Sequence, residues 1–150
     1  MVIHKYYFVF ALISLFVAQG NSQVLECTLD IGGKNPESVV KIFQLNEAQK
    51  AQVEELRAKY SITSKGIEDE MTKLLAEHPQ STPEELLTMA EKYKALQAKL
   101  VLASRDIDEG LLTTFNQKQY SLYLSLCHEA FRIPIEVTPV IYDGPPGEKK

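Results

Sequence analysis

Few side chains in this sequence could carry out chemistry, and the two cysteines are the most reactive of them. Cys27 and Cys127 are far from the Cys-x-x-Cys spacing of a redox motif. This spacing favours a structural disulfide that ties the N-terminal part of the chain to its last helix, with a redox-active pair as the alternative. In the chain-entropy model, closing so long a loop contributes about 4–5 kcal/mol.

Histidines and acidic clusters offer little for catalysis or metal binding. His78 and His128 stand apart, without the His-x₃-His or Glu-x-x-His spacing that makes ligands converge. Two acidic clusters, 68–70 and 106–109, could hold a cation, but a solvated helix face explains them better. The sequence also has no glycine-rich phosphate loop and no nucleophile elbow. We therefore expect no catalytic residue, no metal ligand, no cofactor and no enzymatic activity.

Tyrosine and methionine side chains offer binding chemistry instead, because both adapt to varied apolar partners. The candidates for an apolar client-binding surface are Tyr60, Met71, Met89 and Tyr93. The alternative is that these side chains fill the seams of a small helical bundle. The net charge of −4 gives no basic footprint for nucleic acid, so we expect no nucleic-acid partner.

One five-residue pattern occurs twice, at 45–49 (LNEAQ) and 115–119 (FNQKQ). Both copies read apolar, Asn, x, x, Gln. Asn is a preferred N-cap, and a Gln side chain three residues later can accept a hydrogen bond from the backbone N–H of the cap. Each copy therefore predicts the start of a helix. The residues assigned to this positioning role, rather than to client binding, are Leu45, Asn46, Gln49, Phe115, Asn116 and Gln119.

The first 22 residues have the pattern of a secretory signal peptide. Lys5 precedes an uncharged, almost wholly apolar run over 6–18, and small residues follow at cleavage spacing. The run of about 13 residues is shorter than the ~20 of a spanning helix, which favours cleavage over a membrane anchor. Loss of Lys5 removes one positive charge from the net −4 and leaves −5. We therefore expect an exported chain that can hold a disulfide and has no stable membrane insertion after cleavage.

Residues 23–35 predict an ordered N-terminal arm, because Gly32 and Gly33 break any helical periodicity. A single helical domain is expected over 36–132. It begins with a short helix at about 36–43, where Asn35 precedes Pro36 in the pattern of an N-cap and a first helical residue.

Two long helices are predicted next, at about 46–78 and 83–112. Each carries an apolar stripe with helical spacing. Residues 61–66 (SITSKG) have low helix propensity and predict a bend or a mobile turn in the first long helix. Between the two, Pro79 ends one helix, and Thr82 with Glu85 predicts a capping box for the next. So short a connection makes the pair an antiparallel hairpin.

The last predicted helix, about 117–132, is apolar over a wide arc, which indicates burial on more than one side or contact with a partner. Several prolines follow in residues 133–150. We expect this tail to pack in extended form up to Tyr142 and to be disordered from Gly144 onward. The predicted fold class is all-α: a hairpin of two long helices, a short N-terminal helix and a C-terminal helix packed on it, and an extended tail.

Over residues 38–131 the chain resembles the Spy/CpxP family of bacterial periplasmic proteins, in which two Leu-Thr-x-x-Gln motifs each open a helix. Here Asn replaces Thr in both copies, and residues 53–56 (VEEL) follow the first copy in the family's style. The resemblance implies a periplasmic homodimer of four-helix cradles that holds unfolded or partly folded proteins without ATP. Two departures are the acidic composition, where family chaperones have a basic concave face, and the cysteine pair.

Three functions are therefore weighed. The first is an exported, ATP-independent, chaperone-like protein that holds unfolded or partly folded clients in the cell envelope. The second is an envelope-stress sensor or regulatory partner of one specific membrane protein. The third is a structural, secreted helical protein. The first two place the chain in the periplasm, and the third outside the cell.

Overall fold

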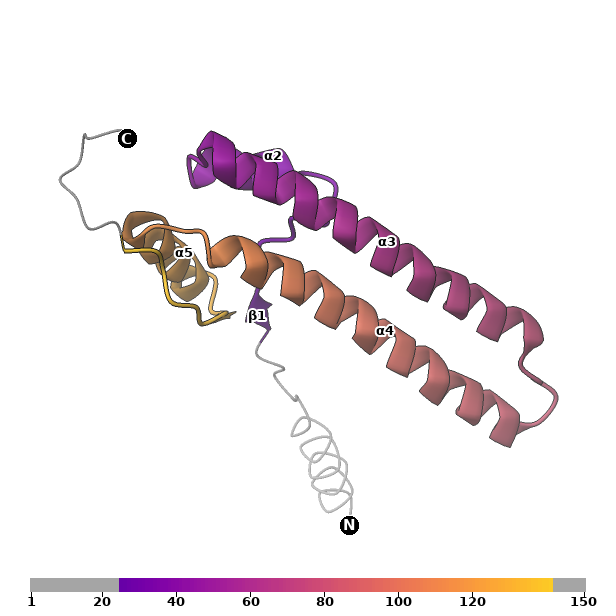
Figure 1. The fold of residues 1–150 in the computed structure, drawn as a ribbon. Coiled ribbons are helices and arrows are strands. Elements are labelled where there is room, and N and C mark those ends of the chain that lie inside the picture. Colours follow the sequence, from indigo (N-terminus) through magenta and orange to yellow (C-terminus); the bar gives the residue numbers. More distant parts are fainter. Residues whose placement is uncertain (1–24, 142–150) are drawn as a thin grey trace, which may run out of the picture.

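The computed structural model describes residues 25–141, and the structural statements below concern these residues. The predicted signal peptide and the end of the tail, from Tyr142 onward, lie outside them. In chain order the elements are β1 (Glu26–Cys27), α2 (Pro36–Ile42), α3 (Glu47–Glu77), α4 (Pro83–Leu112), α5 (Gln117–Glu129) and β2 (Ile133–Pro134). Helices α3 and α4 form a long hairpin, and α2 and α5 gather at one end of it (Figure 1). The predicted all-α hairpin is confirmed.

Local signals in the sequence place most helix ends correctly. Helix α4 begins after Thr82, whose side chain accepts from the backbone N–H of Glu85, while the Glu85 side chain accepts from the backbone N–H of Thr82. Helix α2 begins at Pro36 as expected, but Asn35 makes no side-chain cap. Helix α5 ends at Glu129, three residues before the predicted end.

The predicted bend at residues 61–66 is wrong, because α3 continues as one helix from Glu47 to Glu77. The hydroxyl of Thr63 donates to the carbonyl of Lys59 at 3.1 Å, and that of Ser64 donates to the carbonyl of Ser61 at 3.3 Å. Both side chains therefore bond to carbonyls of the preceding turn, which leaves the helix continuous. Side chains on either side of this stretch pack against α4 or the core, and this packing outweighs the low propensity.

One large core lies at the end of the hairpin where the other elements gather. We call this region the base: the arm, α2, α5, the tail, and the ends of α3 and α4 that touch them. Its side chains come from every one of these elements. The buried members are Cys27, Ile31, Val39, Phe43, Leu45, Val53, Leu56, Ile107, Leu111, Leu112, Phe115, Tyr120, Tyr123, Cys127 and Ile135.

A second, much smaller core lies in the rest of the hairpin, between residues 66 and 100, which we call the distal half. Only Ile67, Met71 and Leu96 are buried there. Leu74, Tyr93 and Leu100 pack against them and are half-buried. The distal half is therefore a seam between two helices with no third layer.

The arm and the tail meet in a short parallel strand pair that the sequence did not predict. The backbone N–H of Ile133 donates to the carbonyl of Leu25 at 3.1 Å, and Glu26 pairs with Ile133 in register. The tail then packs over the base in extended form, as predicted up to Ile141, with Ile135 buried. The backbone N–H of Val140 donates to the carbonyl of Phe115 at 2.8 Å.

Candidate functional site

Both copies of the repeated motif form complete capping boxes. Asn46 accepts from the backbone N–H of Gln49 at 2.9 Å, and the Gln49 side chain accepts from the backbone N–H of Asn46 at 3.1 Å. The corresponding distances for Asn116 and Gln119 are 2.9 and 3.0 Å. The predicted role of these residues as helix starts is confirmed.

The two motifs also bind each other, a contact that the sequence did not predict. The amide nitrogen of Gln49 donates to Oε1 of Gln119 at 2.9 Å, and the amide nitrogen of Gln119 donates to Oε1 of Gln49 at 3.0 Å. Each amide gives its second hydrogen to a backbone carbonyl, of Thr114 and of Phe43 respectively. Every hydrogen-bonding group of the two buried amides is therefore used, and the starts of α3 and α5 are locked together.

Apolar motif residues surround this polar pair. Leu45 and Phe115 are buried, and the ring centroids of Phe115 and Phe43 are 4.9 Å apart. The low dielectric around the amides strengthens their hydrogen bonds and makes the loss of any one costly. The motif therefore has a structural role: it holds the starts of α3 and α5 together. None of its six assigned residues lines the open groove described below.

The disulfide predicted between Cys27 and Cys127 is present, and it joins the arm to α5 across 100 residues of sequence. Both cysteines are buried. Beside the bond, the Tyr123 hydroxyl donates to the carbonyl of Cys27 at 2.6 Å and accepts from the backbone N–H of Ile135 at 2.8 Å. Burial raises the pKa of Tyr123, which keeps this hydroxyl protonated. Such a disulfide is compatible with export.

Asp108 corrects the interpretation of residues 106–109 as a solvated helix face. Its carboxylate is fully buried and accepts from three consecutive backbone N–H groups of the arm. The distances are 2.9 Å from Leu29, 3.0 Å from Asp30 and 3.1 Å from Ile31. Burial raises the pKa of Asp108, although these three donors favour the ionised form. The side chain is therefore an anchor for the arm.

The signal for this role was present in the sequence but weak. Asp108 lies four residues before Leu112 and so shares its helix face, which the arm covers. The arm is held from its other side by Arg57, whose Nη1 donates to the carbonyls of Ile31 and Gly33 at 2.6 and 3.0 Å. The arm is thus pinned between α3 and α4.

Three of the four candidate tyrosine and methionine residues belong to the two cores or pack against them. Tyr60 is half-buried against the base core, where a Cβ at position 32 would lie only 2.8 Å from its ring. Met71 is buried in the distal core, and Tyr93 packs against that core. Met89 is half-buried. The structure therefore does not gather these four side chains on one open surface.

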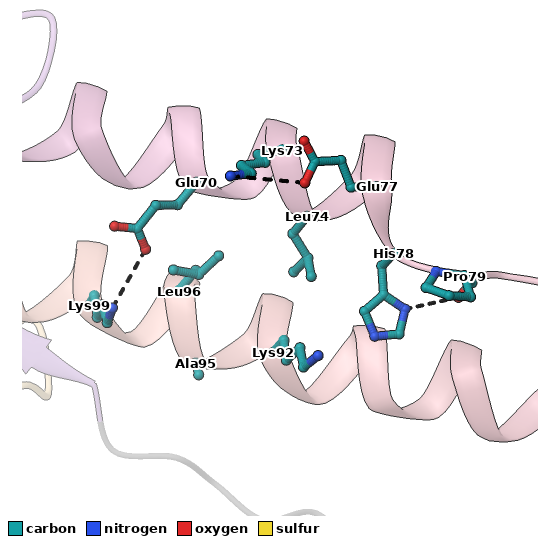
Figure 2. Close-up of a pocket in the computed structure, with 10 residues that line it drawn as sticks. All are labelled: Glu70, Lys73, Leu74, Glu77, His78, Pro79, Lys92, Ala95, Leu96 and Lys99. Atoms are coloured by element: carbon teal, nitrogen blue, oxygen red, sulfur yellow. Dashed lines mark hydrogen bonds and ion pairs between the residues drawn. The ribbon is translucent and has the colours of Figure 1, made fainter.

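A different set of residues forms an open groove of about 650 Å³ in the distal half. Leu74 and Leu96 lie between the two helices, Ala95 lines the groove from the outer edge of α4, and Pro79 lies at the connection (Figure 2). The charged or titratable lining residues are Glu70, Lys73, Glu77, His78, Lys92 and Lys99. The groove thus combines an apolar floor with charges of both signs.

Most of the rim charges face each other in loose pairs. Lys99 lies 3.7 Å from Glu70 and Lys73 lies 3.9 Å from Glu77, all four being largely exposed. Exposed pairs of this kind contribute little stability and can exchange partners. Lys92 forms no ion pair with any residue among 25–141. The rim can therefore accommodate an incoming carboxylate at little cost.

Large aliphatic side chains are also exposed on the distal half outside the groove. Leu75, Leu86 and Leu87 are 47%, 44% and 67% exposed. Within residues 25–141, no group of three His, Cys, Asp or Glu side chains could hold a metal ion. None of the described helices is long and apolar enough to cross a bilayer. The distal half therefore presents apolar side chains for contact, together with exposed charged side chains that are only loosely paired.

Comparison with known proteins assigns neither a family nor a function to this chain. The chain matches no protein-family model, no curated protein and no solved structure.

Proposed function

We propose that this chain is an exported binding protein that holds unfolded or partly folded proteins, without ATP, on the distal half of its helical hairpin. The observation that carries this proposal is the open groove over Leu74, Ala95 and Leu96. It lies in the part of the molecule that has the smallest core. The resemblance of the repeated motif to that of periplasmic Spy/CpxP proteins supports the same function.

The form of the groove favours a polypeptide segment over a small molecule. Small-molecule sites usually enclose most of the surface of their ligand, whereas this groove is open along the hairpin (Figure 2). Its apolar floor can remove an aliphatic side chain from water, worth about 1.5–3 kcal/mol when burial is complete. Its rim of three lysines and two glutamates tolerates flanking residues of either charge. Such a surface binds many sequences weakly.

The direct test is suppression of aggregation. A chemically unfolded protein is diluted into buffer with this chain, without ATP, and light scattering is followed. We expect protection at a stoichiometric ratio. A chain that gives no protection at about tenfold excess over the client, at concentrations up to several hundred micromolar, would contradict the proposal, because occupancy of a weak complex rises with the concentration of the binding protein.

A matched pair of substitutions ties the activity to the groove. Ala95 and Ala98 are both exposed on α4, but only Ala95 lines the groove. Ala95→Glu should reduce protection about threefold or more, because an apolar client segment that binds there would have to remove water from the new carboxylate. Ala98→Glu should leave protection unchanged. Equal effects of the two substitutions would show that protection does not depend on the groove.

A further inference from the structure

Phe131 combines two unfavourable features at the end of α5. Its side chain is 91% exposed, the highest value among the exposed large apolar residues described. Its backbone has φ 53°, in the left-handed region that favours glycine. Asp30 and Gln44 share this conformation, but both are polar. A bulky apolar residue is rarely found in this left-handed conformation.

The surrounding hydrogen bonds show why this conformation is required. The backbone N–H of Phe131 donates to the carbonyl of His128 at 3.1 Å, and that of Arg132 donates to the carbonyl of Cys127 at 2.9 Å. This is the Schellman pattern, in which the left-handed position is usually glycine. Glycine would fit the turn with less strain and would expose less apolar surface. A residue kept in a strained and exposed position points to a contact with another molecule.

A complementary surface exists on the same chain, but out of reach. The groove over Leu74 and Leu96 is near the α3–α4 connection, whereas Phe131 follows α5 in the base (Figure 1). Helix α3 alone, with 31 residues, spans about 46 Å. Phe131 therefore cannot enter the groove of its own chain and can enter only that of another copy.

Charge complementarity favours this pairing. Glu129, two residues before Phe131, is exposed and forms no ion pair with the described residues, and Ser125 contacts it only at 3.5 Å. Lys92, on the groove, likewise has no carboxylate within ion-pair distance (Figure 2). Glu129 and the exposed Arg132 flank Phe131, while lysines and glutamates flank the apolar floor of the groove, so each of these charges can meet one of opposite sign.

We infer that Phe131 of one copy inserts into the distal groove of the next copy, with Glu129 facing Lys92. The contact joins two different surfaces, so copies add head to tail and the assembly can grow beyond a dimer. A contact centred on one aromatic side chain is small, so the association is weak and needs high protein concentration. The inference shares its groove with the proposed function, and the assembly would cover that groove when the protein is abundant.

Sedimentation velocity over about 5 to 500 µM tests the inference. The wild type should show a mass that rises with concentration, and Phe131→Gly should remove at least about 80% of that rise. Phe131→Gly should also keep or raise the melting temperature, by up to about 5 °C, because glycine suits the left-handed position. Ile62→Ala, at an exposed apolar residue of α3 outside the groove, is the control and should assemble like the wild type. A wild type whose mass does not rise, or a Phe131→Gly variant that assembles like the wild type, would overturn the inference.

A charge exchange identifies the two surfaces. Lys92→Glu and Glu129→Lys should each weaken assembly about threefold or more, and the double variant should restore it. Failure of the double variant to recover assembly would show that these surfaces do not meet.

The aggregation assay separates this inference from the proposed function. At low concentration, where the wild type is not assembled, Phe131→Gly should protect a client as well as the wild type does. At high concentration it should protect better, because its grooves remain open. If neither protein protects the client while Phe131→Gly still abolishes assembly, the inference stands and the proposed function fails. Equal protection by the wild type and by Phe131→Gly at high concentration would contradict the inference that assembly covers the groove.

Discussion

The base and the distal half of the hairpin share the same two helices but differ in how they are held. In the base, a disulfide, a buried carboxylate and a pair of buried amides connect the arm, α3, α4 and α5. In the distal half, three buried side chains and one loose surface ion pair, between Lys99 and Glu70, hold the two helices together. No buried side-chain polar atom among residues 25–141 lacks a partner, so the difference is not one of unsatisfied groups.

This contrast separates a rigid support from an adaptable surface. Local stability follows buried apolar contacts and protected hydrogen bonds, and regions that bind varied partners come from its low end. The distal half has few such contacts and carries the open groove. We therefore assign the structural role to the base and propose that partners bind on the distal half. The predictions below test whether the features of the base act as this division requires.

The largest effect is expected from the disulfide. The double variant Cys27→Ala/Cys127→Ala should lose about 4 kcal/mol of unfolding free energy, because the bond closes a 100-residue separation. Urea denaturation measures this loss, and reduction of the wild type should reproduce it. A loss below about 1 kcal/mol would mean that the base does not depend on the covalent link.

Removal of the buried carboxylate should come next. Asp108→Ala leaves three backbone N–H groups of the arm without an acceptor, which should cost about 3 kcal/mol. Hydrogen exchange at Leu29, Asp30 and Ile31 should speed up in parallel. Asp106→Ala, at an exposed carboxylate on the same helix, is the matched control and should stay within about 0.5 kcal/mol of the wild type. Equal losses of unfolding free energy in the two variants would show that Asp108 does not anchor the arm.

The interlocked amides should give a smaller but coupled effect. Gln49→Ala and Gln119→Ala should each cost about 2 kcal/mol, since each loses a capping contact and orphans a buried partner. The double variant should cost about 1 kcal/mol less than the two single losses added together. Gln117→Ala, at an exposed glutamine of the second motif, should have little effect. Strict additivity would show that the two motifs act separately.

The sequence predicts those parts of the fold that short-range signals determine. Capping residues at Asn46, Thr82 and Asn116 mark three helix starts, and the short connection after α3 defines the hairpin. These signals work because each cap bonds to a backbone group three residues away. The disulfide could be predicted as well, because only one pair of cysteines exists.

Features that depend on distant parts of the chain could not be predicted in this way. The Gln49–Gln119 pair joins residues 70 apart, and Asp108 is buried only because the arm crosses α4. The bend expected at residues 61–66 is absent because packing on either side outweighs local propensity. The groove was also not predicted, because none of the four chosen tyrosine and methionine residues lines it, whereas Leu74, Ala95 and Leu96 do.

Hydrogen exchange with mass spectrometry tests the central claim most directly, because it reports both regions in one experiment. Amides of α5 and of the first half of α3 should exchange slowly, and amides of residues 66–77 and 83–100 should exchange faster by about tenfold or more. An unfolded client should slow exchange only in the distal residues. Uniform protection along the hairpin, or client protection confined to the base, would contradict the division between a rigid base and an adaptable distal half.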